Sequence, residues 1–143
     1  MRRNHILLIL ATMIIGISQL SSCHNKSLNI QTAQYAVNGQ KLYKSHCQNC
    51  HGAKGEGLGK LYPPLTDHQF LTSQRDKLAC IIKNGLSGEI NVKGETYNQS
   101  MPALPTITDR DMAYILTYVT THFGNADSTF TQEEVVKSLK NCQ

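Results

Sequence analysis

The chain has 143 residues, the usual length of one domain, and its 14 Lys and Arg against 10 Asp and Glu give a formal net charge of +4. No run rich in lysine or arginine occurs, so the pattern of a nucleic-acid-binding protein is excluded. With no tryptophan and three phenylalanines, the chain has little bulky apolar volume, and a domain this small often needs a covalent or metal staple or a cofactor.

The N-terminus has the pattern of an export signal. Arg2 and Arg3 precede a mainly aliphatic run, Ile6–Ile17. These 12 residues are too few for a membrane-spanning helix, which needs about 20, but they suit the apolar centre of a signal peptide. We therefore predict that the protein is exported.

The signal ends in LSSC, residues 20–23, which resembles the lipobox of bacterial lipoproteins. The resemblance implies a lipoprotein signal peptide over residues 1–22, a lipid anchor on Cys23 and a tether over residues 23–34. The mature protein would then carry a net charge of +2 and be held on a bacterial membrane, facing the periplasm. An ordinary signal peptide, or an uncleaved membrane anchor with an incidental cysteine, is the alternative.

Three core helices are predicted from hydrophobic spacing and capping residues. The first starts near Thr32 and contains Gly39. Glycine inside a helix costs about 1 kcal/mol relative to alanine, so we predict that another backbone comes close there. The second helix covers residues 73–85, with a capping box at its start, and the third covers residues 108–124.

Two stretches rich in glycine and proline, residues 52–72 and 86–106, are predicted to be long loops. Loops of this length in a small domain are expected only where they are functional, so they need something to enclose. A short fourth helix follows, and we interpret it as an appendage rather than part of the core. Its capping box and hydrophobic staple comprise Thr131, Glu134, Phe130 and Val135.

The sequence CQNCH places Cys47 and Cys50 three positions apart, with His51 directly after them. The spacing alone fits a redox dithiol, half of a zinc site or a haem attachment sequence. A redox dithiol needs no histidine there, and a zinc site needs a second pair of ligands, which the isolated Cys80 and Cys142 do not form. Haem attachment is therefore favoured, because two thiols one helical turn apart can reach two vinyl groups while the histidine reaches the iron.

Four pieces of sequence, NGQKLYKSHCQNCHG, YPPLTD, YNQSMPAL and LTYV, occur in the order and at the spacing of the small monohaem class I c-type cytochromes. The chain resembles this family over nearly all of its compact domain, residues 35–124. The resemblance implies an all-α cytochrome c fold, in which three core helices and long loops wrap around one covalently bound haem c. A C-terminal helical extension over residues 125–143 would follow.

The resemblance also implies the residues that surround the iron. Met101 matches the second axial ligand, opposite His51. A proline carbonyl is expected to accept the other ring N–H of His51, with Pro64 as the matching position in preference to Pro63. Met112 lies on the apolar stripe of the third helix and is predicted to fill the core instead.

The other histidines match no position of the family pattern. We predict solvent-exposed or polar-contact roles for them, with a bis-histidine haem through His68 as a minor alternative. They are His24, His46, His68 and His122.

Two cysteines are left over after lipidation at Cys23 and two thioethers. They are Cys80 and Cys142, an even pair in an oxidising compartment. We hypothesise that they form a disulfide between the second and fourth helices, with two free thiols as the alternative.

One-electron transfer is the expected function, and no catalytic base or substrate pocket is signalled, so the chain is not expected to be an enzyme. Expected partners are an upstream quinol-oxidising complex and a membrane-associated terminal oxidase or reductase. A haem peroxidase or gas-binding haem protein with a displaceable Met101 is the alternative. A structural lipoprotein without haem is a third reading.

Overall fold

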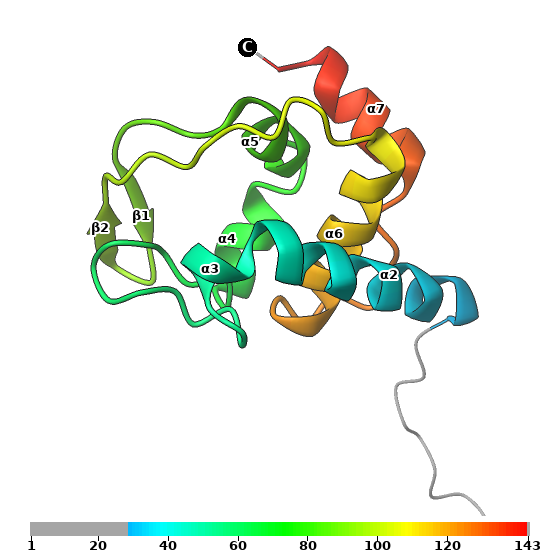
Figure 1. Ribbon diagram of the computed structural model, residues 1–143, viewed down its shortest axis with the longest axis horizontal. Coiled ribbons are helices and arrows are strands. Elements are labelled where there is room, and N and C mark those ends of the chain that lie inside the picture. The colour runs from blue at the N-terminus through cyan, green and yellow to red at the C-terminus, as the bar shows by residue number, and fades with distance from the viewer. Residues whose placement is uncertain (1–28, 143) are drawn as a thin grey trace, which may run out of the picture.

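Helices form the framework of residues 29–142, the part of the chain that this computed structural model describes (Figure 1). The elements in chain order are α2 (Ile30–His46), α3 (Gln48–His51), α4 (His68–Ser73), α5 (Leu78–Asn84), β1 (Ile90–Val92), β2 (Glu95–Tyr97), α6 (Asp109–His122) and α7 (Gln132–Lys140). The predicted all-α class is confirmed, with the addition of one small antiparallel hairpin, β1–β2.

The predicted signal peptide, Cys23 and most of the predicted tether lie outside the described residues. Within residues 29–142, no helix combines the length and the hydropathy that crossing a membrane requires.

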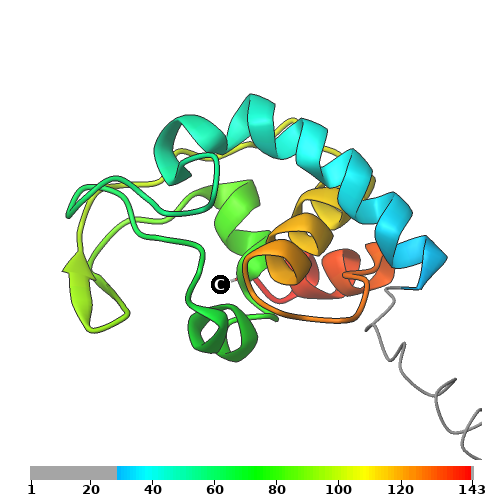
Figure 2. The same ribbon diagram turned by 90° about the horizontal axis from the view of Figure 1, so that it is seen from below.

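The long helices α2 and α6 pack against each other, as both views of the ribbon show (Figures 1 and 2). A Cβ atom placed on Gly39 would overlap the backbone carbonyl of Tyr114 and lie 2.8 Å from the Cβ of Tyr118. Aromatic pairs flank this contact, Tyr35 with Tyr114 at a centroid distance of 4.7 Å and Tyr43 with Tyr118 at 5.3 Å. The close backbone approach predicted at Gly39 is therefore confirmed.

The second predicted helix is in fact two helices. α4 begins inside the predicted loop because the Asp67 carboxylate accepts the backbone N–H groups of Gln69 (3.0 Å) and Phe70 (3.1 Å). The predicted capping box on Ser73 is wrong, since its hydroxyl donates to the Phe70 carbonyl (3.1 Å) at the end of α4. A turn separates α4 from α5, and α5 stops before Gly85 as predicted.

The β1–β2 hairpin lies within a stretch predicted to be a loop. Its paired residues are Ile90–Tyr97, Asn91–Thr96 and Val92–Glu95. Lys93 and Gly94 form the turn with positive φ angles of 52° and 79°, the combination that two-residue hairpin turns favour. The Asp67 carboxylate accepts the Lys93 N–H (3.0 Å), so the hairpin is tied to the start of α4.

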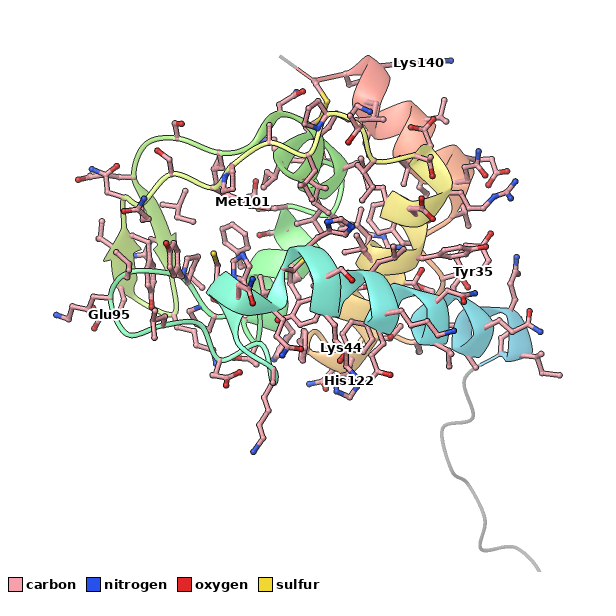
Figure 3. All side chains as sticks on the ribbon, viewed as in Figure 1. Tyr35, Lys44, Glu95, Met101, His122 and Lys140 are labelled. Atoms are coloured by element: carbon pink, nitrogen blue, oxygen red, sulfur yellow. A yellow bond between two sulfur atoms is a disulfide. The ribbon has the colours of Figure 1, made fainter. Side chains whose placement is uncertain are left out.

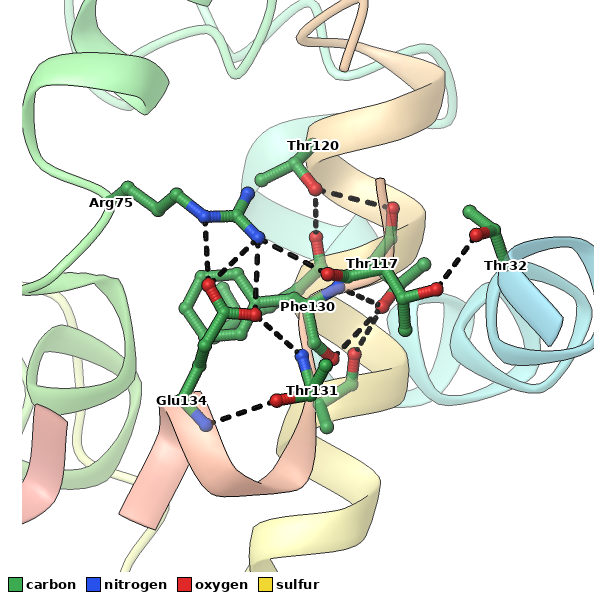
Figure 4. Close-up of polar contacts among 10 residues, drawn as sticks. Thr32, Arg75, Thr117, Thr120, Phe130, Thr131 and Glu134 are labelled. Carbon is green, nitrogen blue, oxygen red and sulfur yellow. Dashed lines mark hydrogen bonds and ion pairs between the residues drawn. The ribbon is translucent and has the colours of Figure 1, made fainter. Parts of the chain in front are cut away.

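The C-terminal helix α7 belongs to the core, so its interpretation as an appendage is wrong. Its predicted capping box is present, because the Thr131 hydroxyl accepts the Glu134 N–H (3.1 Å) and the Glu134 carboxylate accepts the Thr131 N–H (2.8 Å). Phe130 and Val135 are 1% and 0% exposed and join the main hydrophobic cluster. In Figure 4 the Thr117 hydroxyl of α6 accepts the Phe130 N–H (3.0 Å), which fixes the start of α7 against α6.

A disulfide links α5 to the end of the chain. It joins Cys80 and Cys142, whose Cα atoms lie 5.6 Å apart although 62 positions separate them in sequence. This is the pairing hypothesised from the cysteine count. In the chain-entropy model, a cross-link over a loop of this length stabilises the fold by roughly 4 kcal/mol.

Candidate functional site

The C-x-x-C-H motif forms one helical turn that continues α2. The Cys47 N–H donates to the Tyr43 carbonyl (2.9 Å), and the His51 N–H donates to the Cys47 carbonyl (3.0 Å). Cys50 lies one turn after Cys47, so the two side chains leave the same face of the segment. The buried Tyr43 hydroxyl donates to the Gly52 carbonyl (2.6 Å) and fixes the end of the motif to α2.

His51 is held in one orientation by its hydrogen bond to the loop that follows. The ring is 9% exposed, and its Nδ1 donates to the Pro63 carbonyl (3.0 Å). With the proton on Nδ1, the lone pair of Nε2 is free to ligate a metal. Burial lowers the pKa of His51, and the Pro63 hydrogen bond opposes that shift only in part. The imidazole is therefore neutral, which is the form that binds iron.

The carbonyl that holds His51 is that of Pro63, so the prediction of Pro64 is wrong. Leu58 and Tyr62 pair across a tight turn, with the Leu58 N–H donating to the Tyr62 carbonyl (3.0 Å). The chain leaves this turn directly at Pro63, and its carbonyl faces the imidazole. Pro64 is still part of the site, as a residue that lines the cavity beside His51.

An apolar cavity opens beside His51. Counted with its mouth to the solvent it measures about 720 Å³, within the range of roughly 300–1,000 Å³ typical of pockets for small organic ligands. His51, Cys47 and Asp67 are its ionisable lining residues, and the remaining lining is apolar. The walls come mainly from α4, α5, β1 and α6, through Leu71, Leu78, Ile82, Val92, Ile115 and Leu116. Such a cavity suits a bulky apolar cofactor that a few polar groups hold in place.

Met101 lines the same cavity, from the segment between β2 and α6. In Figure 3 this segment passes above α3, and Met101 lies on it. Its backbone pairs with Leu86 in both directions, since the Met101 N–H donates to the Leu86 carbonyl (2.8 Å) and the Leu86 N–H donates to the Met101 carbonyl (3.1 Å). Met112 is instead fully buried in α6, as predicted. The two predicted axial ligands, His51 and Met101, therefore line one cavity.

The surroundings of Cys47 disfavour the other two interpretations of the motif. Burial raises the pKa of the Cys47 thiol to about 11, with the neighbouring Cys50 as a second cause. A redox dithiol needs a thiol whose pKa is lowered, so this environment is the opposite of what it requires. In the described part of the chain, no three His, Cys, Asp or Glu side chains lie close enough together to hold a metal ion, so a zinc site has no ligand set.

The other described histidines lie away from the cavity. His46, His68 and His122 are at least partly exposed, and none of them lines it. His122 stacks on the ring of Tyr118 at a centroid distance of 4.9 Å. These positions agree with the predicted surface roles and give the alternative ligand His68 no support, while His24 lies outside the described residues.

Sequence reasoning missed the walls that α4 and the hairpin contribute to the site. Phe70 and Ile90 line the cavity from stretches predicted to be loops. Two signals were present in the sequence. Asp67 precedes α4 as a capping acid, and the Lys93–Gly94 pair stands between short alternating segments.

The chain is similar to known cytochromes. A sequence model of the cytochrome c family matches residues 36–123. A cytochrome c-552 of Thermus thermophilus is 34% identical over 110 residues, which cover 71% of this chain and 83% of that protein. A second cytochrome c-552, from another strain of that species, has the same identity over 74% of its length. A fructose dehydrogenase cytochrome subunit of Gluconobacter japonicus is 28% identical over 120 residues, which cover 78% of this chain and 24% of that subunit.

The matched family, the motif and the cavity agree with one another. The residues placed to hold a haem are Cys47 and Cys50 on one helical turn, with the neutral imidazole of His51 beside an apolar cavity. The match also spans the helices that build this cavity. The chain therefore belongs to the cytochrome c family, as a monohaem class I c-type cytochrome that carries covalently attached haem c and serves electron transfer.

Proposed function

We propose that this cytochrome is a one-electron carrier whose iron is ligated by His51 and Met101. The observation that carries the proposal is that these two side chains, fifty positions apart, line one apolar cavity. Cys47 and Cys50 would hold the haem through two thioether bonds. With both axial positions filled, no coordination site is open to a substrate, which is expected of a carrier and not of a peroxidase or a gas-binding protein.

When bound, haem supplies an iron that changes oxidation state by one electron. The residues of the chain set the free energy of that change. His51 is neutral because Pro63 holds its Nδ1 proton, and a thioether is neutral as well, so neither proposed ligand offsets the extra positive charge of the ferric state. The apolar walls disfavour that charge further. Both effects favour a raised reduction potential.

We propose a membrane-associated terminal oxidase or reductase as the electron acceptor. The donor would be an upstream quinol-oxidising complex or a membrane dehydrogenase. The similarity to a fructose dehydrogenase cytochrome subunit supports the dehydrogenase class, because that relative is by its name a subunit of such an enzyme.

Rapid mixing tests the carrier function. Reduced holoprotein should be reoxidised by bacterial membranes that contain terminal oxidases or reductases, and inhibitors of the acceptor should stop the reaction. The matched control replaces the membranes by hydrogen peroxide, which should oxidise the protein slowly and without sustained turnover. Turnover of peroxide with an added electron donor, and no reaction with membranes, would contradict the carrier function and favour a peroxidase.

We also propose that the mature chain begins at Cys23 and is lipid-anchored to a bacterial membrane, facing the periplasm. The LSSC sequence after a short apolar run supports this location. Replacing Cys23 by serine should move the protein from the membrane fraction to a soluble or unprocessed form, whereas Ser27→Ala in the same tether should leave it in the membrane. Recovery of Cys23→Ser in the membrane fraction, processed at the same site, would disprove the anchor.

A further inference from the structure

We propose that the C-terminal extension is a positioning element for Met101. The extension holds α5 from outside, and α5 in turn holds the segment that presents the methionine sulfur to the cavity. The proposal rests on the proposed ligation by Met101. It gives a role to the Cys80–Cys142 disulfide and to α7 that electron transfer by itself does not require.

The end of α5 carries the backbone of the Met101 segment. The Leu104 N–H donates to the Ile82 carbonyl (3.0 Å), and Met101 and Leu86 exchange two hydrogen bonds (2.8 and 3.1 Å). The Lys83 ammonium also donates to a carbonyl of this segment, that of Ile107 (3.2 Å). No regular helix or strand contains residue 101, so its backbone position depends on where α5 ends.

Gly85 makes this contact close. It follows α5 with a φ of 76°, and a Cβ placed on it would lie 2.5 Å from the Met101 carbonyl oxygen. A shift of α5 therefore moves the backbone of Met101 directly, because no side chain separates the two segments. The side chains of Leu78, Ile81 and Ile82 line the cavity from the same helix.

α5 is too short to hold its own position. It has seven residues, and the residue before it, Lys77, makes no side-chain capping hydrogen bond. Isolated helices of this length are unstable in water, so α5 depends on the surfaces that it contacts. One of these surfaces is the apolar side facing the cavity and α6, and the other is α7.

The disulfide fixes the outer side of α5 to the extension. Cys80 is the third residue of α5, and Cys142 lies just beyond the end of α7. Both sulfur atoms lie within 3.6 Å of the Ser138 carbonyl of α7, and Ser138 is itself buried. The bond therefore attaches α5 to a packed part of α7.

A second contact fixes the turn before α5. The Arg75 guanidinium donates to both carboxylate oxygens of Glu134, at 3.1 and 3.3 Å, and to the Thr129 carbonyl at 3.3 Å. It also lies over the ring of Phe130, 4.5 Å from the centroid. Figure 4 shows this group between the turn, α6 and α7. Because Phe130 is buried against α6, both contacts connect α5 to the most rigid part of the fold.

The test removes the disulfide without leaving a free thiol, in the variant Cys80→Ala/Cys142→Ala. In the ferrous holoprotein at a temperature well below unfolding, carbon monoxide should bind at least about fivefold faster than in the parent, the lower end of coupling between sites in proteins. The methionine-to-iron charge-transfer band of the ferric protein should weaken. Hydrogen exchange should be faster at the amides of Met101 and Leu104, and unchanged at Tyr43 in α2.

The matched control is Tyr35→Leu, which removes an edge-to-face aromatic pair with Tyr114 between α2 and α6. It should lower the unfolding temperature without changing carbon monoxide binding or the charge-transfer band. Glu134→Gln keeps the disulfide and weakens the Arg75 contact, so it should shift all three measurements in the same direction by a smaller factor. If the double variant does not accumulate, Glu134→Gln alone decides the question.

Two outcomes would overturn the proposal. The double variant, or Glu134→Gln in its place, could unfold at a lower temperature with all three measurements unchanged, so that the extension only stabilises the fold. Alternatively, Tyr35→Leu could change them as much. Failure of the Met101 ligation is recognised separately, because the parent would then lack the charge-transfer band and Met101→Ala would not alter carbon monoxide binding. In that case, faster exchange at Leu104 still supports positioning by the extension, and unchanged exchange still refutes it.

Discussion

Replacing Met101 by alanine should lower the reduction potential of the holoprotein by a few tenths of a volt, within the span of roughly 0.8 V over which axial ligands set haem potentials. Removal of the sulfur takes away a ligand that favours the ferrous state and admits water to an apolar cavity. The ferric charge-transfer band should disappear, and the ferrous protein should bind carbon monoxide rapidly. Redox titration and absorption spectroscopy of the purified protein measure these changes.

Met112→Leu is the matched control for Met101→Ala. Met112 is 0% exposed in α6, and a swap that conserves volume usually costs less than about 1.5 kcal/mol. The variant should therefore lose some stability and keep the potential and the spectrum of the parent. If Met101→Ala leaves the potential and the ferric spectrum unchanged, Met101 is not a ligand. If the unaltered protein already binds carbon monoxide quickly, the peroxidase or gas-binding function is favoured instead.

Replacing Cys47 and Cys50 together by serine should abolish covalent retention of haem. Protein produced in a host that matures c-type cytochromes should then show no haem on the polypeptide after denaturation and extraction. Its unfolding should also be less cooperative, because nothing would fill the cavity that helices from separate parts of the chain surround. Loss of a group bound at about a thousand times its Kd costs about 4 kcal/mol, and a covalently held group contributes at least as much.

The control for that variant is Cys80→Ala/Cys142→Ala, which also removes two sulfur atoms. These cysteines are bonded to each other, and neither lines the haem cavity, so this control should retain its haem after denaturation. Loss of haem from both double variants to the same extent would show that misfolding causes the loss, and would remove the support for thioether bonds at Cys47 and Cys50.

The helix ends were predictable from local sequence where a cap acts within its own turn. Thr108 accepts the Asp111 N–H (3.1 Å), and Thr131 and Glu134 complete their capping box as predicted. The start of α4 was missed because Asp67, an equally good capping residue, lies among loop signals. The failure at Ser73 has the same cause, since several residues of this segment could cap a helix and only packing selects one of them.

The pairing of the hairpin and the role of α7 required the three-dimensional structure. The Asp67 carboxylate reaches Lys93, 26 positions later, and sequence spacing contains no information on such a contact. The spacing of Phe130 and Val135 indicated an amphipathic start for α7. It did not show that α6 provides the surface that buries both residues.

By itself, the sequence determined the chemistry of this protein. Two thiols and a histidine on one helical turn restrict the cofactor to a few kinds, and the helix stripes, the loops and Gly39 agree with one fold, because their meaning depends only on neighbouring positions. The tertiary structure decided what depends on distant contacts. It selected Pro63 over Pro64 through the turn at Tyr62, and it placed Met101 against the end of α5. It also joined α5 to the C-terminal extension, because long-range packing and hydrogen bonds position those groups.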